Sequence, residues 1–310
     1  MAGQPSKTQV HIDTALTNFA IAYASRMGYV ADQIPTIPVE KQSNKYFIYD
    51  PDEWMKNAAA LRGPATESQG GGFTVSNATY YCDPVAWHMD VDDQTKRNAD
   101  NPIDLLRDAA RFVGQRLALR AESDFATAFF GASVWGGSGA PSPTWDDVAS
   151  TPIENIRAQS NGIIEKTGYK PNTLIVGAEV HKRLVDHPDI LDRIKYTQKG
   201  VVSADLLASL FEVDRYLVHY ASANSSAEGV TASFNFLGNS GLSALLCHLN
   251  PAANLISAPT ALARFQWSGM GIDRFDIRET KCTRIEGEQA YDFKVTGSDL
   301  GYEFTSAVAS

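Results

Sequence analysis

Residues 101–131 read NPIDLLRDAARFVGQRLALRAESDFATAFFG and carry the strongest structural signal in the chain. Apolar residues recur here at spacings of three and four, which is the period of one helix face. They are Leu106, Ala109, Ala110, Val113, Leu117, Ala121, Phe125, Ala128 and Phe129. Asn101 is suited to cap the helix, Pro102 to occupy its first position, and Gly131 to end it. The sequence therefore predicts one helix about 40 Å long that spans the subunit.

Two segments upstream of this helix predict a long β-hairpin. Residues 45–54 (KYFIYDPDEW) and 73–82 (FTVSNATYYC) are rich in aromatic and β-branched side chains, with glycines at 70–72 between them. Because aromatic residues stand at consecutive positions in both strands, both faces are expected to need a cover. Residues 34–41 (IPTIPVEK) contain two prolines and predict an extended arm, and residues 6–30 predict an amphipathic helix before it.

The pattern changes downstream of the long helix. Residues 135–145 (WGGSGAPSPTW) have the composition of a loop, and helical and strand-like segments alternate from Thr151 onwards. The expected helices are 152–167, 178–184 and 203–211, and the expected strands are 173–176, 216–220, 291–295 and 302–308. This order predicts a mixed α/β unit followed by terminal strands.

Composition excludes several classes of protein. The 310 residues are 44% hydrophobic and 20% charged, which is typical of a globular chain and not of a disordered one. There is no apolar run long enough for a membrane span and no apolar secretory segment at the start, so we expect a soluble intracellular protein. Lysine and arginine total 27 against 36 acidic residues, a net charge of −9, which argues against a primary nucleic-acid or membrane binder.

Motifs that carry chemistry are incomplete. Residues 136–139 and 238–241 resemble a nucleophile elbow but lack its last glycine, and residues 269–274 begin like a dinucleotide loop but end in arginine. The acidic cluster 88–93 (HMDVDD) fails the calcium-loop template and is interpreted as a solvated turn before the long helix. Cys82, Cys247 and Cys282 form no CxxC pair. We expect no catalytic residue, no cofactor and no metal.

Four strings, in this order, resemble the major capsid proteins of tailed bacteriophages, which have the Hong Kong 97-like fold. They are YVADQIPTIPVEKQSNKYFIYD (29–50), RNADNPIDLLRDAARFV (97–113), YKPNTLIVGAEVHKRLVDHPDILDRIKYTQKGVVS (169–203) and ALLCHL (244–249). The resemblance implies an α+β fold in four parts. These are an N-terminal arm (1–40), an extended loop (41–88), a peripheral domain with the long helix (89–150 and 265–310) and an axial α/β domain (151–264).

The resemblance implies a structural protein that performs no reaction. It would assemble with many copies of itself, as hexamers and pentamers, into the icosahedral shell of a virion, in the cytoplasm of the bacterial host. Scaffolding, portal and decoration proteins are the implied further partners, with genomic DNA held non-specifically and no membrane. The implied inter-subunit contacts, on the loop and the arm, are Tyr46, Phe47, Tyr49, Trp54, Tyr80, Tyr81, Ile34 and Ile37.

Two other functions stay open at this stage. An encapsulin-like compartment would share the fold but enclose a cargo enzyme in place of a genome. A soluble α/β hydrolase would need a nucleophile, a base and an orienting acid within hydrogen-bond reach, and no motif in the sequence supplies them.

Overall fold

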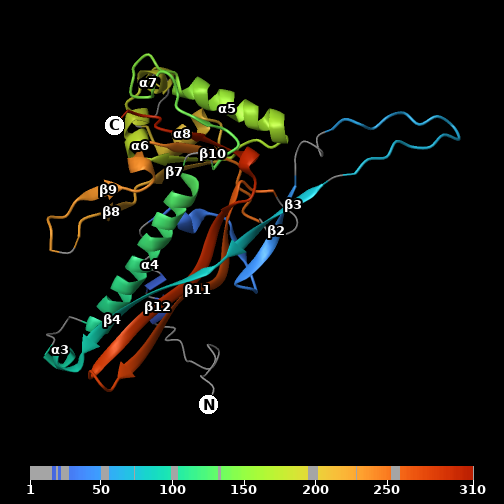
Figure 1. The fold of residues 1–310 in the computed structure, drawn as a ribbon. Coiled ribbons are helices and arrows are strands. Elements are labelled where there is room, and N and C mark those ends of the chain that lie inside the picture. The colour runs from blue at the N-terminus through green and yellow to red at the C-terminus, as the bar shows by residue number, and fades with distance from the viewer. Residues whose placement is uncertain are drawn as a thin grey trace.

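The computed structural model describes residues 16–18, 20–21, 28–49, 56–72, 74–98, 104–131, 134–194, 202–227, 229–252 and 259–309. A four-stranded sheet with one long helix forms one end of the body, and a five-stranded sheet with shorter helices forms the other (Figure 1). Two hairpins project from this body in different directions. Among the described helices, none is long and apolar enough to cross a membrane.

The long helix is α4, Leu105–Phe129, and it runs the length of the four-stranded sheet (Figure 1). It begins later than predicted: the N-cap is Asp104, whose carboxylate accepts a hydrogen bond from the Arg107 amide at 3.2 Å. Asn101 and Pro102, expected at this position, lie outside the described residues. The predicted apolar face is confirmed, since Ala109, Val113 and Phe125 are completely buried.

The four-stranded sheet has the order β1-β11-β12-β4. Its strands are β1 (Thr36–Pro38), β11 (Leu262–Ile277), β12 (Cys282–Val295) and β4 (Asp83–Asp92). The central strand β12 faces α4 closely at Gly287, where a Cβ atom would lie 2.6 Å from a methyl group of Val113. Further along β12, the side-chain amide of Gln289 donates to the Leu117 carbonyl of α4 at 2.9 Å, and the Tyr291 hydroxyl donates to the Asp124 carboxylate at 2.8 Å.

The acidic cluster 88–93 is not the solvated turn that was expected. Residues 88–92 lie within β4, and Asp93 begins the short helix α3, Asp93–Asn98. Arg284 of β12 stands opposite Asp90 and forms two hydrogen bonds to it, at 2.7 and 2.8 Å, so cross-strand pairing accommodates this one carboxylate. The guanidinium of Arg284 also lowers the pKa of the Asp90 carboxyl.

The five-stranded sheet has the order β5-β13-β10-β6-β7. Its strands are β5 (Ser138–Gly139), β13 (Gly301–Phe304), β10 (Ala244–Cys247), β6 (Thr173–Gly177) and β7 (Arg215–His219). The predicted alternation is confirmed, because the helices α5 (Pro152–Thr167), α6 (Ala178–Val185), α7 (Pro188–Ile194) and α8 (Ala204–Leu210) lie between these strands in the chain. Their apolar faces and one face of the sheet form a core around Trp145.

The predicted domain boundaries stay a prediction, and membership of the two sheets divides the chain in another way. Residues 138–139 and 301–304 belong to the five-stranded sheet, although 89–150 and 265–310 were both assigned to the peripheral domain. The physical reason is the free edge of β10, which β13 covers from Ala244 to Cys247. Trp145 also packs with the five-stranded sheet. Its backbone amide donates to the Ala307 carbonyl at 2.8 Å, and the centre of its ring lies 4.9 Å from that of Phe304.

The predicted hairpin is confirmed by β2, Ser43–Tyr49, and β3, Val75–Tyr81, which pair antiparallel from Ser43↔Tyr81 to Tyr49↔Val75. A second hairpin consists of β8, Ser222–Asn224, and β9, Phe234–Phe236. Single 3-10 turns are η2 (Ala31–Gln33), η3 (Asn239–Gly241) and η4 (Ser298–Leu300). Of the helix predicted over residues 6–30, residues 16–18, 20–21 and 28–30 are described. The first two groups are helical, but residues 28–30 are not, so the prediction is wrong at its C-terminal end, where Gly28 has a φ of 64°.

Candidate assembly interface

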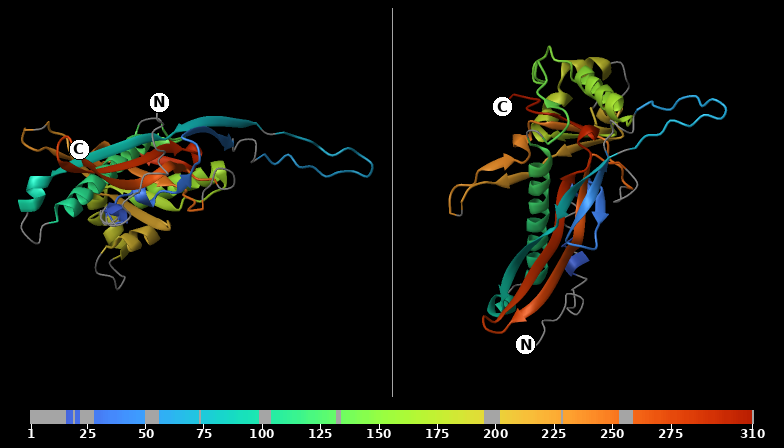
Figure 2. Two further views of the ribbon diagram at one scale, coloured as in Figure 1. Left: turned by 90° about the horizontal axis from the view of Figure 1, so that it is seen from below. Right: turned by 45° about the vertical axis from the view of Figure 1, so that its right-hand side comes forward.

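The loop between β2 and β3 leaves the body of the subunit altogether. It extends away from both sheets in every view (Figures 1 and 2), and each residue from 56 to 72 is exposed. Its hydrogen bonds within the described range are internal: Arg62 donates to the Thr66 carbonyl at 2.6 Å, and Thr66 donates back to the Gly63 carbonyl. Leu61 is fully exposed. Within residues 56–72, the hydrogen bonds therefore do not tie the loop to the rest of its own subunit.

The base of the hairpin has one covered face and one open face. On the covered face, the rings of Tyr46 and Tyr80 pack 5.2 and 4.7 Å from that of Phe265 in β11. On the open face, Phe47 is 62% exposed, Tyr81 54% and Val75 40%. Both faces were expected to need a cover, and β11 of the same subunit supplies it for one of them.

The eight residues expected to contact a neighbouring subunit fall into three groups. Ile34, Ile37, Tyr46 and Tyr80 are buried within their own subunit. Ile37 is in β1, which pairs in parallel with β11, so this part of the arm lies on its own sheet. Phe47 and Tyr81 are exposed and remain candidates. Tyr49 pairs with Val75 but its side chain is outside the described part, as is Trp54.

A further apolar surface on the four-stranded sheet escaped sequence reasoning. Trp87 and Met89 of β4 and Phe112 of α4 are 38–47% exposed, and the Arg116 guanidinium lies 5.1 Å from the Phe112 ring and 5.7 Å from that of Trp87. The signal was present in the chain: in DPVAWHMDVD, the apolar residues at odd positions indicate a strand.

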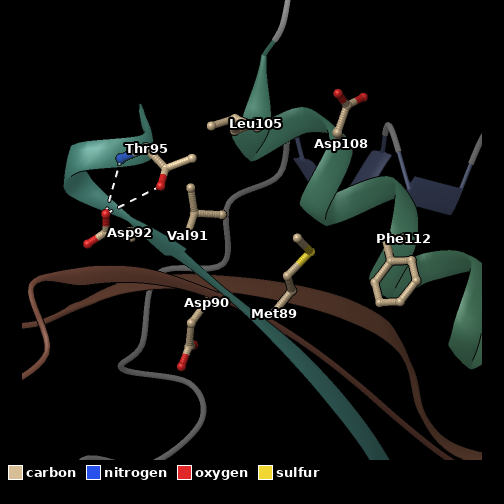
Figure 3. Close-up of a pocket in the computed structure, with 8 residues that line it drawn as sticks. All are labelled: Met89, Asp90, Val91, Asp92, Thr95, Leu105, Asp108 and Phe112. Carbon is tan, nitrogen blue, oxygen red and sulfur yellow. Dashed lines mark hydrogen bonds between the residues drawn. The ribbon is translucent and has the colours of Figure 1, made fainter. Parts of the chain in front are cut away.

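Next to this surface lies a shallow hollow of about 360 Å³ between β4, α3 and α4 (Figure 3). Its apolar lining includes Met89, Val91, Leu105 and Phe112, and Asp92 at its rim accepts hydrogen bonds from Thr95. The exposed apolar lining is the kind of surface that proteins cover with another chain.

The β8–β9 hairpin is the second projecting element, and it also escaped prediction. Phe234 is 69% exposed and Val230 66%. Its tip is tied together by polar groups: Asn224 Oδ1 accepts hydrogen bonds from the amides of Ser226 and Ser233, both at 3.0 Å. An exposed but internally braced hairpin is prepared for contact without further ordering.

One serine–histidine pair, Ser150 and His187, has the spacing of a catalytic nucleophile and its base. Ser150 Oγ lies 2.9 Å from His187 Nε2, and both side chains are buried. The Asp189 amide donates to His187 Nδ1 at 3.2 Å, so Nδ1 is the acceptor and Nε2 carries the proton. A protonated Nε2 cannot take a proton from the serine, and the pair acts as a helix-end contact. Among the described residues, no group of three histidine, cysteine or acidic side chains is placed to hold a metal.

Comparison with protein families and curated sequences gives consistent matches. A family model described as phage major capsid protein E matches residues 137–226, within the five-stranded sheet and its helices. A major capsid protein of Burkholderia phage BcepMu is 26% identical over 222 residues, covering 70% of this chain and 71% of the relative. A major capsid protein of Pseudomonas phage JBD67 is 24% identical over 310 residues, covering 96% of this chain and 98% of the relative.

Solved structures resemble the chain over most of its length. A phage-related protein from Bordetella bronchiseptica RB50 has a TM-score of 0.73 at 19% identity and covers 96% of this chain and 99% of its own. A virus-like particle from Pyrococcus furiosus has a TM-score of 0.62 at 11% identity, covering 93% and 97%. The capsid structure of cyanophage P-SCSP1u has a TM-score of 0.57 at 12% identity, covering 87% and 85%. The likeness establishes a shared fold.

Proposed function

We infer that this chain, a major capsid protein of a tailed phage with the Hong Kong 97-like α+β fold, assembles as hexamers and pentamers into an icosahedral shell around double-stranded DNA. It is a component of the virion, and its role is structural.

The extended loop carries the proposal. Residues 56–72 stand clear of the subunit, and the hairpin below them has an open face with Phe47, Val75 and Tyr81. An element that makes no contact with its own body is stabilised only when another chain covers it. A projecting loop that binds a different surface of the next copy makes a head-to-tail contact. Such contacts form a closed ring when the rotation from copy to copy completes a full turn.

The charge of the subunit fits a container for DNA. With a net charge of −9, the shell as a whole repels phosphate, so the genome is held loosely and without sequence preference. We propose assembly in the cytoplasm of the bacterial host, with scaffolding and portal proteins and, in some states, a decoration protein as further partners.

Electron microscopy of a loop-deletion variant tests the proposal. Removal of residues 57–72 leaves β2 and β3 joined by a short connection and leaves the covered hairpin face, with Tyr46 and Tyr80, intact. We expect the variant to keep the unfolding midpoint of the natural protein but to form no closed particles or hexameric rings. The matched control is Val148→Ser, which changes another strongly exposed apolar side chain away from the loop and leaves assembly unchanged.

Closed shells from the deletion variant would overturn the assignment of the loop. The contents of particles purified from phage-producing cells test the rest of the proposal. Nuclease-resistant double-stranded DNA supports a genome container. A uniform packaged protein without DNA would instead support a nanocompartment, for which the similarity to the Pyrococcus furiosus virus-like particle is the relevant observation.

A further inference from the structure

A carboxylate is buried at the point where three parts of the subunit meet. Glu122, in the middle of α4, is completely buried, and its two oxygens accept hydrogen bonds from the amides of Val30 and Ala31 at 3.0 and 2.8 Å. Val30 is the N-cap of η2 and Ala31 is its first residue. Residues 30–33, which precede the proline-containing arm, are called the arm root below. A buried carboxylate is very costly unless it is paired and hydrogen-bonded, so the arm root and Glu122 depend on each other.

The third part is the five-stranded sheet. His219 of β7 is also buried, and its Nε2 lies 3.0 Å from Glu122 Oε1, although without the alignment of a directed hydrogen bond. The rings of Phe125 and Phe130 lie about 6 Å from the imidazole. From the same strand, Arg215 donates to the Gln33 carbonyl at 3.3 Å and to its side-chain oxygen at 3.1 Å. Strand β7 therefore contacts the arm root directly at Gln33, and it reaches Val30 and Ala31 only through Glu122.

The four-stranded sheet holds the arm root from the other side. Arg264 of β11 lies 3.7 Å from Asp32, with its guanidinium 4.7 Å from the ring of Tyr291. Burial raises the pKa of the Asp32 carboxyl, and the charge of Arg264 opposes that rise. The arm then continues into β1 on the same sheet. Residues 30–33 thus contact both sheets through charged side chains.

We propose that this cluster is a conformational latch: the arm root is held from both sides only while β7 lies against α4, so that a rotation between the two sheets promotes release of the arm. If β7 moves away, Glu122 loses His219 and Gln33 loses Arg215, and a buried carboxylate is left with the arm amides alone. The partner of the released arm in a shell rests on the proposed function, whereas the docking itself is a property of one subunit.

Amide hydrogen exchange of Val30 and Ala31 reports on the latch directly. The decisive variants are His219→Leu and Arg215→Ala, because both residues lie in the five-stranded sheet and neither contacts these amides. We expect each variant to speed the exchange of both amides at least tenfold in the full-length protein. The matched control is Asp124→Asn, two positions from Glu122 on α4, whose carboxylate binds Tyr291 and not the arm. It leaves the exchange of Val30 and Ala31 unchanged.

Unchanged exchange in both β7 variants, with faster exchange in Glu122→Gln, would overturn the latch, because the arm would then be bound by α4 alone. Arg215 is partly exposed, so its variant keeps the test decisive even where loss of His219 disturbs folding. The measurement needs no shell. If shells form normally but the β7 variants do not change the exchange of Val30 and Ala31, the latch is refuted and the proposed function stands. If assembly fails but the β7 variants do speed this exchange, the latch stands and the proposed function is refuted.

Discussion

The effect of adding a Cβ atom on stability should differ sharply between Gly177 and Gly162, which lie in the same half of the molecule. At Gly177, at the end of β6, a Cβ would collide with the carbonyl group of Gly241, which is backbone and cannot turn aside. At Gly162, inside α5, no atom lies within 4 Å of the added carbon. We expect Gly177→Ala to lower the free energy of unfolding by about 3 kcal/mol or more, and Gly162→Ala to raise it by about 1 kcal/mol. Urea unfolding of both variants measures the contrast, and equal effects would contradict this packing.

Glu303 gives the subunit a pH dependence that can be isolated. Its side chain in β13 is 2% exposed, its Oε2 has no hydrogen-bond partner among the described residues, and burial raises the pKa of its carboxyl to about 7. Because the folded state holds this proton more tightly than the unfolded state, the associated stability is present at low pH. It is lost as the pH rises from about 4.5 to 7.

The corresponding variant is Glu303→Gln, which removes the titration and keeps the shape of the side chain. We expect it to be more stable than the natural protein above pH 7, by at most about 3 kcal/mol, with the difference shrinking towards pH 5. Thermal unfolding at pH 5, 6, 7 and 8 measures this. A constant difference across that range would mean that the carboxyl is not the titrating group.

At the scale of elements, the two faces of the β2–β3 hairpin should separate folding from assembly. Tyr80 stacks on Phe265 within the subunit, so Tyr80→Ala is expected to cost about 3 kcal/mol of folding free energy. Phe47 is on the open face, so Phe47→Ser is expected to change that free energy by less than about 0.5 kcal/mol and to prevent assembly. Urea unfolding and electron microscopy of both variants give the answer. A folding defect in the Phe47 variant would place its ring against its own subunit.

Elements were predictable where a local period dominates. The apolar face from Ala109 to Phe129 follows from helical spacing, and a hairpin of residues 45–54 and 73–82 follows from β-rich composition, although the observed pairing is of 43–49 with 75–81. Strand β4 was missed because Asp90, Asp92 and Asp93 suggested solvent. Arg284, the residue that makes Asp90 acceptable in a strand, is distant in the sequence and adjacent only in the sheet. Local patterns carry no information on such partners.

At the scale of the whole molecule, the same limit applies to the candidate interface. Tyr46 and Phe47 are adjacent aromatic residues, and only the position of Phe265 decides that one is buried and the other exposed. The placement of Glu122 beside Val30 and His219 likewise needs the helix, the arm and both sheets to be assembled first. The sequence could therefore mark the hairpin as a candidate interface, but not which of its side chains are exposed to form one.

Net charge should make assembly of this subunit depend on salt in a definite direction. Each copy carries a net charge of −9, so copies repel one another. The open hairpin face and the hollow both present exposed apolar side chains, among them Phe47 and Tyr81 on the face and Met89 and Phe112 in the hollow. Salt shortens the screening length from about 30 Å at 0.01 M to about 8 Å at 0.15 M, which weakens repulsion while leaving apolar contact intact. We therefore expect the concentration needed for assembly to fall as sodium chloride rises over this range. Light scattering measures that threshold, with Phe47→Ser as the control that does not assemble at either salt concentration. A threshold that rises with salt would show that inter-subunit ion pairs, and not apolar contacts, hold the copies together.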